Sequence, residues 1–168
     1  MVVAVVIALA IPWLTQLSFG LHAQGWHVGR SGTIHTAVGS SHARVPMSTA
    51  WAANVRYRDS ATSAPPNATL RHLPPRGIVV WASIQLPTEA WPPDHRRLSV
   101  HYSLVNAYRL ACCEAAGIGG GEWELYGFGP RRAYTVLVRV YWGSPPTEAM
   151  KAEAERALHT LRLPRATP

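Results

Sequence analysis

Residues 133–161 change their hydrophobic period from two to about 3.6 at a Ser-Pro-Pro sequence, and this change constrains the fold more than any other feature. Over residues 133–143 alternate side chains are apolar and share one face of an extended chain: Tyr134, Val136, Val138, Val140 and Trp142. Beyond Pro146 the apolar residues have the spacing of one helical face: Met150, Ala154, Ala157, Leu158 and Leu161. Ser144 or Thr147 can cap this helix, and Pro164 follows it. The sequence therefore predicts a strand followed by an amphipathic C-terminal helix that packs on a sheet.

Four other segments have the pattern of strands, at residues 49–58, 77–87, 98–104 and 122–129. Residues 77–87 are apolar on both faces, which is typical of a central strand, whereas 49–58 and 98–104 alternate and predict one buried side. The sequence Pro130-Arg131-Arg132 predicts a hairpin between 122–129 and 133–143. We therefore expect the α+β class, with an antiparallel sheet of about five strands and the C-terminal helix packed on one face.

Residues 106–121 contain the least decisive pattern in the chain. Val105, Tyr108, Cys112 and Ala115 have helical spacing, which favours a short helix ending near Gly117. The glycine-rich sequence at residues 117–121 lacks the Lys-Ser/Thr ending of a phosphate-binding loop and leads into a strand. We interpret it as a flexible loop and expect no cofactor there.

Cys112 and Cys113 are the only cysteines of the chain. Neighbouring Cα atoms lie about 3.8 Å apart, whereas a disulfide usually needs about 4.4–6.8 Å, so the two residues are not expected to bridge each other. The eight histidines have no paired metal spacing with them, and we expect no metal site. The preferred interpretation is small packing residues, with a vicinal redox pair or an intermolecular link as alternatives.

Residues 1–23 predict an apolar leader, either a signal peptide or a membrane anchor, because residues 1–14 are uninterrupted apolar sequence. The alternative, a buried core helix, is opposed by Pro12. No Lys or Arg precedes the apolar stretch and the first arginine is Arg30, so the positive-inside rule opposes export unless translation starts further upstream. The Gly-, Ser- and His-rich residues 24–48 predict an irregular or weakly stranded segment that serves as a flexible tether, and residues 49–164 a single domain.

The chain is basic, with 16 Lys and Arg against 9 Asp and Glu among 168 residues, and all but one of the cations are arginine. The arginines are scattered and no recognition motif accompanies them, so nucleic acid is not the expected partner. The expected partners are the membrane, through the leader, and an anionic envelope component or another envelope protein. A possible binding surface combines a loop tryptophan with the two arginine doublets: Trp91, Arg96, Arg97, Arg131 and Arg132.

Catalytic motifs are absent from the sequence: there is no Gly-x-Ser-x-Gly and no His-Glu-x-x-His. Glu122 and Glu124 share one strand face, which would suit an acid/base pair or a calcium contact, but we expect a solvated edge. The sequence therefore favours a non-catalytic binding or structural module at the cell envelope. A small envelope hydrolase that uses His101 is the alternative.

Three segments, LPPRGIVVW, TAWAANVRYRD and AYTVLVRVYWGSPPTEAMKAEAERALHTLRLP, together resemble a group of exported or membrane-anchored proteins of actinobacteria. The resemblance covers about residues 51–164. It implies export and one undivided domain, and it carries over no activity and no site residue.

Overall fold

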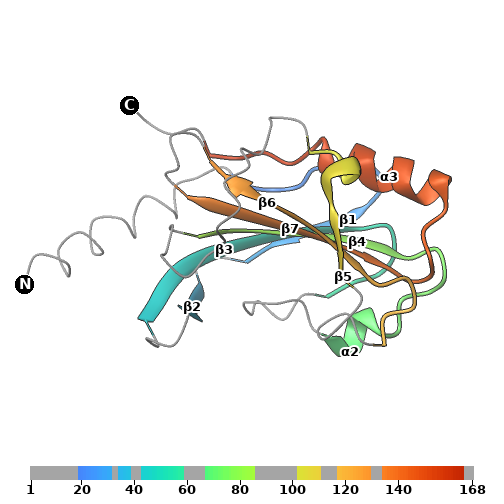
Figure 1. The fold of residues 1–168 in the computed structure, drawn as a ribbon, viewed down its shortest axis with the longest axis horizontal. Helices are drawn as coiled ribbons and strands as arrows, with labels where there is room; N and C mark the ends of the chain where they lie inside the picture. The colour runs from blue at the N-terminus through green and yellow to red at the C-terminus, as the bar shows by residue number, and fades with distance from the viewer. Residues whose placement is uncertain are drawn as a thin grey trace, which may run out of the picture.

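The computed structural model describes residues 19–31, 34–38, 43–58, 67–85, 102–110, 117–129 and 134–164. Within these ranges one antiparallel sheet carries a C-terminal helix on one face, which confirms the predicted α+β class (Figure 1). The strands are β1 (His27–Arg30), β2 (Ile34–Val38), β3 (Ala43–Ala53), β4 (Ile78–Gln85), β5 (Tyr108–Leu110), β6 (Glu122–Phe128) and β7 (Thr135–Trp142). The helices are α2 (Asn67–Leu70), the 3-10 helix η1 (Leu104–Asn106) and α3 (Glu148–Leu158).

The described strands have the order β1-β3-β4-β7-β6-β5, and β2 also pairs with β3. β1 and β2 pair with different halves of β3: Arg30 lies opposite Ala50, and Ile34 lies opposite Met47. The sheet is therefore six strands wide, one more than the sequence predicts. The hairpin between β6 and β7 and the central position of β4, which is buried along its whole length, are as predicted.

The predicted tether over residues 24–48 is wrong in part, because these residues supply β1, β2 and the first half of β3. Ser31 extends this pairing: its backbone N–H donates to the Thr49 carbonyl oxygen at 3.0 Å, and the two hydroxyls lie 2.5 Å apart. Edge strands need few apolar side chains, since the partner strand supplies their hydrogen bonds. The polar composition of this segment therefore conceals its strands.

Apolar side chains cover both faces of the sheet. One face carries α3 together with residues 19–26 and the chain beyond α3, and the alternating residues of β7 all point to it, as predicted. The opposite face buries Val79 and Trp81 of β4 with Leu137 and Tyr141 of β7, under Leu70 of α2. Both faces are thus buried in the described part of the chain.

The C-terminal helix has the predicted position and cap. The Thr147 hydroxyl accepts a hydrogen bond from the Met150 N–H, and Met150, Ala154, Ala157 and Leu158 are buried. α3 ends at Leu158, so Leu161 lies in the following segment and is only partly buried. That segment bonds back to the start of the described chain, where Gly20 and Arg162 exchange two backbone hydrogen bonds.

The prediction of a short helix after residue 106 is wrong for residues 108–110, which form the strand β5; residues 111–116, with both cysteines, lie outside the described residues. Tyr108 and Leu110 pair with Glu124 and Glu122 of β6, and this extra edge strand overrides the weak helical spacing. The predicted strand at 98–104 falls largely outside the described residues, and Leu104 begins η1.

The glycine sequence at residues 117–121 is an ordered turn and not the flexible loop that the sequence predicts. The Gly120 N–H donates to the Trp142 carbonyl oxygen at 2.8 Å, and Gly121 has φ of 78°, a conformation that favours glycine. A Cβ atom at position 120 would overlap the backbone carbonyl of Ser144. These glycines allow the turn to pack directly against the chain that leaves β7.

We expect Gly120→Ala to lower the free energy of unfolding by about 1–3 kcal/mol, because either the turn or the end of β7 must move to admit the methyl group. Gly20→Ala is the matched control, since a Cβ there meets only the His22 side chain at 3.4 Å. Urea denaturation followed by circular dichroism measures both. Equal losses in the two variants would contradict the packing role.

No helix among the described residues is long and apolar enough to cross a membrane.

Candidate functional site

The residues predicted as a binding surface, Trp91, Arg96, Arg97, Arg131 and Arg132, all lie outside the described residues. His101, on which the alternative of an envelope hydrolase depends, also lies outside them. That surface and that alternative therefore remain predictions.

Glu122 and Glu124 are buried, with 1% and 2% of their surface exposed, so the prediction of a solvated edge is wrong. β5 pairs with β6 on the side away from β7, so β6 is an interior strand. On the neighbouring strand, Arg139 lies directly opposite Glu124. Its Nε is 2.8 Å from Glu124 Oε1 and 3.1 Å from Glu122 Oε1, so one guanidinium group contacts both carboxylates.

Two tyrosine hydroxyls complete this buried group. The Tyr126 hydroxyl donates to Glu124 Oε2, and the Tyr141 hydroxyl donates to Glu122 Oε1 at 3.3 Å. Burial raises the pKa of both tyrosines above the usual value, and the neighbouring carboxylates raise it further. Both hydroxyls therefore remain neutral donors at physiological pH.

Aromatic rings lie beside the charged group, on the same face of the sheet, and form a row of side chains with it. The Arg139 guanidinium lies 5.9 Å from the centroid of the Trp81 ring, and Trp81 pairs with Trp51 on β3. Trp51 in turn lies against Gly29 of β1, where a Cβ atom would meet the indole at 2.6 Å. The row thus runs from β1 to β6, and its charged members are enclosed by rings.

The role of this buried group is to hold strands β6 and β7 together. Each carboxylate is engaged by Arg139 and by a tyrosine, which leaves the pair poorly placed to exchange protons with a substrate. No three His, Cys, Asp or Glu residues of the described ranges come close enough to hold a metal ion.

Two further buried tyrosines, Tyr134 and Tyr102, make the free energy of unfolding depend on pH. Burial raises the pKa of Tyr134 from 10.0 to about 12, and burial raises the pKa of Tyr102 as well. A raised pKa means that the native state retains a proton that the unfolded chain loses. The contribution of Tyr134 to the free energy of unfolding is therefore complete below pH 10.0 and is lost as pH rises toward 12. The free energy of unfolding should therefore fall in this range.

Urea denaturation from neutral to alkaline pH measures the effect. Tyr134→Phe should flatten part of the decline, because it removes the group whose pKa burial raises. An identical profile for Tyr134→Phe and the wild type would contradict the assignment.

Four exposed arginines belong to the segments at the end of the sheet where β3 and β7 finish and β4 begins. We call Arg56, Arg58, Arg71 and Arg76 the basic end; all four are exposed. Asn54 joins the two loops that carry them, because its side-chain amide donates to the Arg76 carbonyl oxygen at 3.0 Å and its backbone N–H donates to the Ile78 carbonyl oxygen. Tyr57 and Leu70 pack in one cluster and bring Arg58 and Arg71 to the same region.

The described acids form two groups, the buried pair Glu122 and Glu124 and the acids of α3. The acids outside the interior all lie on α3: Glu148, Glu153 and Glu155. Glu148 pairs with Lys151, Glu155 accepts a hydrogen bond from the Leu104 N–H, and Glu153 accepts one from Asn54. Among the described acids, Glu153 is therefore the one that approaches the basic end.

Comparisons with family models, curated proteins and solved structures find no match to this chain. The resemblance to exported proteins of actinobacteria therefore remains a prediction, and the interpretation of function depends on the chain's own chemistry.

Proposed function

We propose that the chain is a non-catalytic binding module at the cell envelope, and that its basic end binds an anionic envelope component. The observation that carries the proposal is that four exposed arginines lie at one end of the sheet, where Glu153 is an acid of α3 that approaches them through Asn54. Guanidinium groups suit phosphate and carboxylate ligands because their planar N–H donors match two acceptor oxygens at once.

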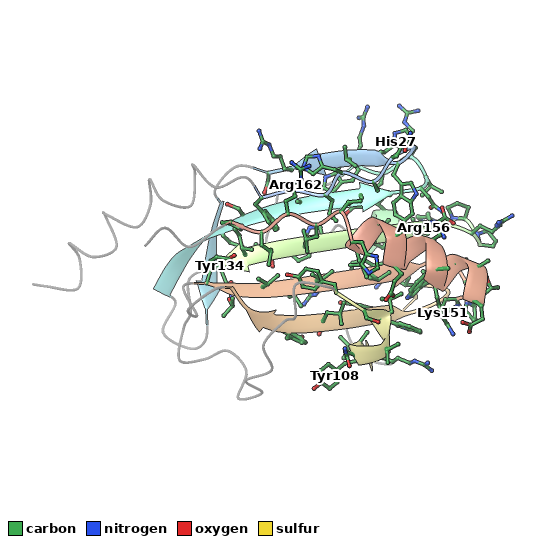
Figure 2. All side chains as sticks on the ribbon, turned by 90° about the horizontal axis from the view of Figure 1, so that it is seen from above. His27, Tyr108, Tyr134, Lys151, Arg156 and Arg162 are labelled. Carbon is green, nitrogen blue, oxygen red and sulfur yellow. The ribbon has the colours of Figure 1, made fainter. Side chains whose placement is uncertain are left out.

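The position of residue 19 supports a wall polymer as the envelope component that the basic end reaches. Gly20 bonds to Arg162, and the nearby Pro164 carbonyl accepts a hydrogen bond from Tyr134 at the start of β7. The basic end lies at the other end of β7, and the two ends are separated along the sheet in Figures 1 and 2. A chain anchored through residues 1–18 would therefore present its basic end away from the anchor, toward an anionic wall polymer.

The test is sedimentation of the full-length chain, in neutral detergent, with insoluble cell-wall material. We expect binding that weakens as salt rises and that falls at least about tenfold when the four arginines of the basic end are replaced by Gln. Arg30→Gln/Arg162→Gln is the control for loss of positive charge, because Arg30 lies opposite Ala50 within the sheet and Arg162 bonds to Gly20. Binding that ignores salt, or that survives in the fourfold variant, would contradict the proposal.

Export is the second part of the proposal, and residues 1–14 support it because an apolar run of this kind suits the translocon or a bilayer. A fusion of residues 1–30 to a reporter that is active only after export should give signal. Ile7→Arg/Leu9→Arg in the same fusion should abolish the signal, because two charges interrupt the apolar region. A silent wild-type fusion, also when tested with upstream sequence, would count against export.

A further inference from the structure

A groove runs between α3 and the strands β5 and β6, on the helix-covered face of the sheet. It consists of two adjoining depressions of about 430 and 440 Å³ that share Arg109, Trp123 and Lys151. Among the described strands β5 is the last of the sheet order, and this short strand forms one side of the groove (Figure 1). Figure 2 labels Lys151, which lines the groove from α3, and Tyr108 on the strand β5, whose own side chain lines neither depression.

Two cations lie over the same indole ring at the middle of the groove. The Arg109 guanidinium is 4.7 Å and Lys151 Nζ is 5.8 Å from the Trp123 ring centroid. Trp123 is itself fixed, since it is 7% exposed and packs edge-to-face on Trp142 with centroids 5.4 Å apart. Two positive charges thus lie within 4.7 and 5.8 Å of one rigid ring at the shared part of the two depressions.

The acids of the groove leave these cations available. Lys151 pairs with Glu148 at 2.5 Å, but the Glu148 side chain is 89% exposed, and such solvated pairs contribute little. Glu155 Oε2 accepts a hydrogen bond from the Leu104 N–H at 3.0 Å, which holds η1 against α3 at one end. Arg109 forms no ion pair with the acids that the structure describes.

Outside the shared residues, each depression has apolar residues or glycines in its lining, together with Glu148 and Glu155 in one and Glu122 in the other. Leu104 and Val105 line one depression, and Val105 is 91% exposed. Gly120, Gly121 and the pair Pro145-Pro146 line the other. A complementary ligand is therefore narrow and extended, with one negative charge near its middle and apolar groups beside it.

We propose that this groove binds an extended peptide segment of a partner protein, with one carboxylate held between Arg109 and Lys151. A helix facing an edge strand is a common setting for such segments, since the backbone of the strand and pockets for alternate side chains are both in reach. The presence of Glu148 and Glu155 at the rim opposes a polyanion or an anionic membrane, which would bring several negative charges against them. A single carboxylate would gain contact with both cations and would have to displace only the exposed Glu148 carboxylate from Lys151.

This proposal is independent of the one for the basic end, because the two surfaces share no residue. The probes are fluorescein-labelled octapeptide pools, degenerate except for a fixed Glu, Gln or Lys at the fifth position, and binding to the full-length chain is measured by anisotropy. We expect the Glu pool to bind about tenfold more tightly than the Gln pool, and Arg109→Gln to remove that preference. Arg156→Gln, an exposed cation on the same domain, should leave it intact.

Lys151 is the only lysine of the chain, so a carbodiimide can report where the carboxylate lies. In a Glu148→Gln background, which removes the acid that would couple to Lys151 within the chain, the Glu pool should become amide-linked to Lys151, as mapped by mass spectrometry. Lys151→Arg keeps the charge and should retain binding while losing the cross-link.

Equal binding of the Glu and Gln pools would overturn the proposal, as would a cross-link confined to the N-terminal amine or no binding at about 1 mM peptide. Binding to phosphatidylglycerol vesicles without any response to the peptide pools would also overturn it, in favour of a lipid-binding groove. Circular dichroism of each variant shows whether the fold is retained. If Arg109→Gln does not fold, the comparison of Lys151→Arg with the wild type still tests whether the carboxylate lies at Lys151.

Discussion

Replacing Arg139 with Leu is expected to lower the free energy of unfolding by about 3–5 kcal/mol, because it leaves two buried carboxylates without their cation. The side chains of Glu122 and Glu124 are 0% and 3% exposed, and both contact the Arg139 Nε. Loss of the guanidinium therefore removes the attraction while the cost of burying the acids remains. Urea denaturation of the full-length chain measures the difference.

The matched control is the triple variant Glu122→Gln/Glu124→Gln/Arg139→Met, which removes all three charges and retains similar volume. It should recover much of the stability, because buried ion pairs replaced as a unit are often nearly neutral. If the triple variant is as unstable as Arg139→Leu, packing around Arg139 and not its charge determines the effect.

Leu158→Ala is expected to cost about 2–5 kcal/mol, because Leu158 is fully buried between α3 and the sheet. The cavity would open against the face that carries Val138 and Val140. Leu161→Ala should cost less, since Leu161 lies beyond the helix and is only partly buried. Thermal and urea unfolding of the two variants rank the positions.

Arg156→Ala is the appropriate surface control on α3, because its side chain is exposed. Glu153 is unsuitable, since it accepts a hydrogen bond from Asn54 and so links the helix to the end of β3. Equal losses for Leu158→Ala and Arg156→Ala would contradict the orientation of the helix described here.

The strand–helix order at the end of the chain could be predicted because each element there carries its own signal. β7 alternates over eight residues, and Thr147 caps a helix with an uninterrupted apolar stripe. β1 and β2 have no such signal: His27–Arg30 is mostly exposed, and its extended form depends on pairing with β3. Local pattern predicts elements that bury their own side chains, and it misses those that are held by a partner.

The burial of Glu122 and Glu124 was missed for a related reason. With residues 108–110 taken as helix, β6 becomes an edge strand and its acids face water. The three residues of β5 reverse that conclusion, because they enclose β6 and leave Arg139 as the nearest cation. The signal was present in the hairpin: pairing Phe128 with Thr135 places Glu124 opposite Arg139. Sequence pattern alone does not determine that register.

The bonding of Gly20 to Arg162 has a mechanical consequence for an anchored chain. It places the chain's entry point at one end of the strands, with the basic end at the other. Tension between an anchor and a bound wall polymer would then run along the strands, while the hydrogen bonds between them lie across that direction. Such a load acts across several inter-strand hydrogen bonds at the same time instead of opening them one after another.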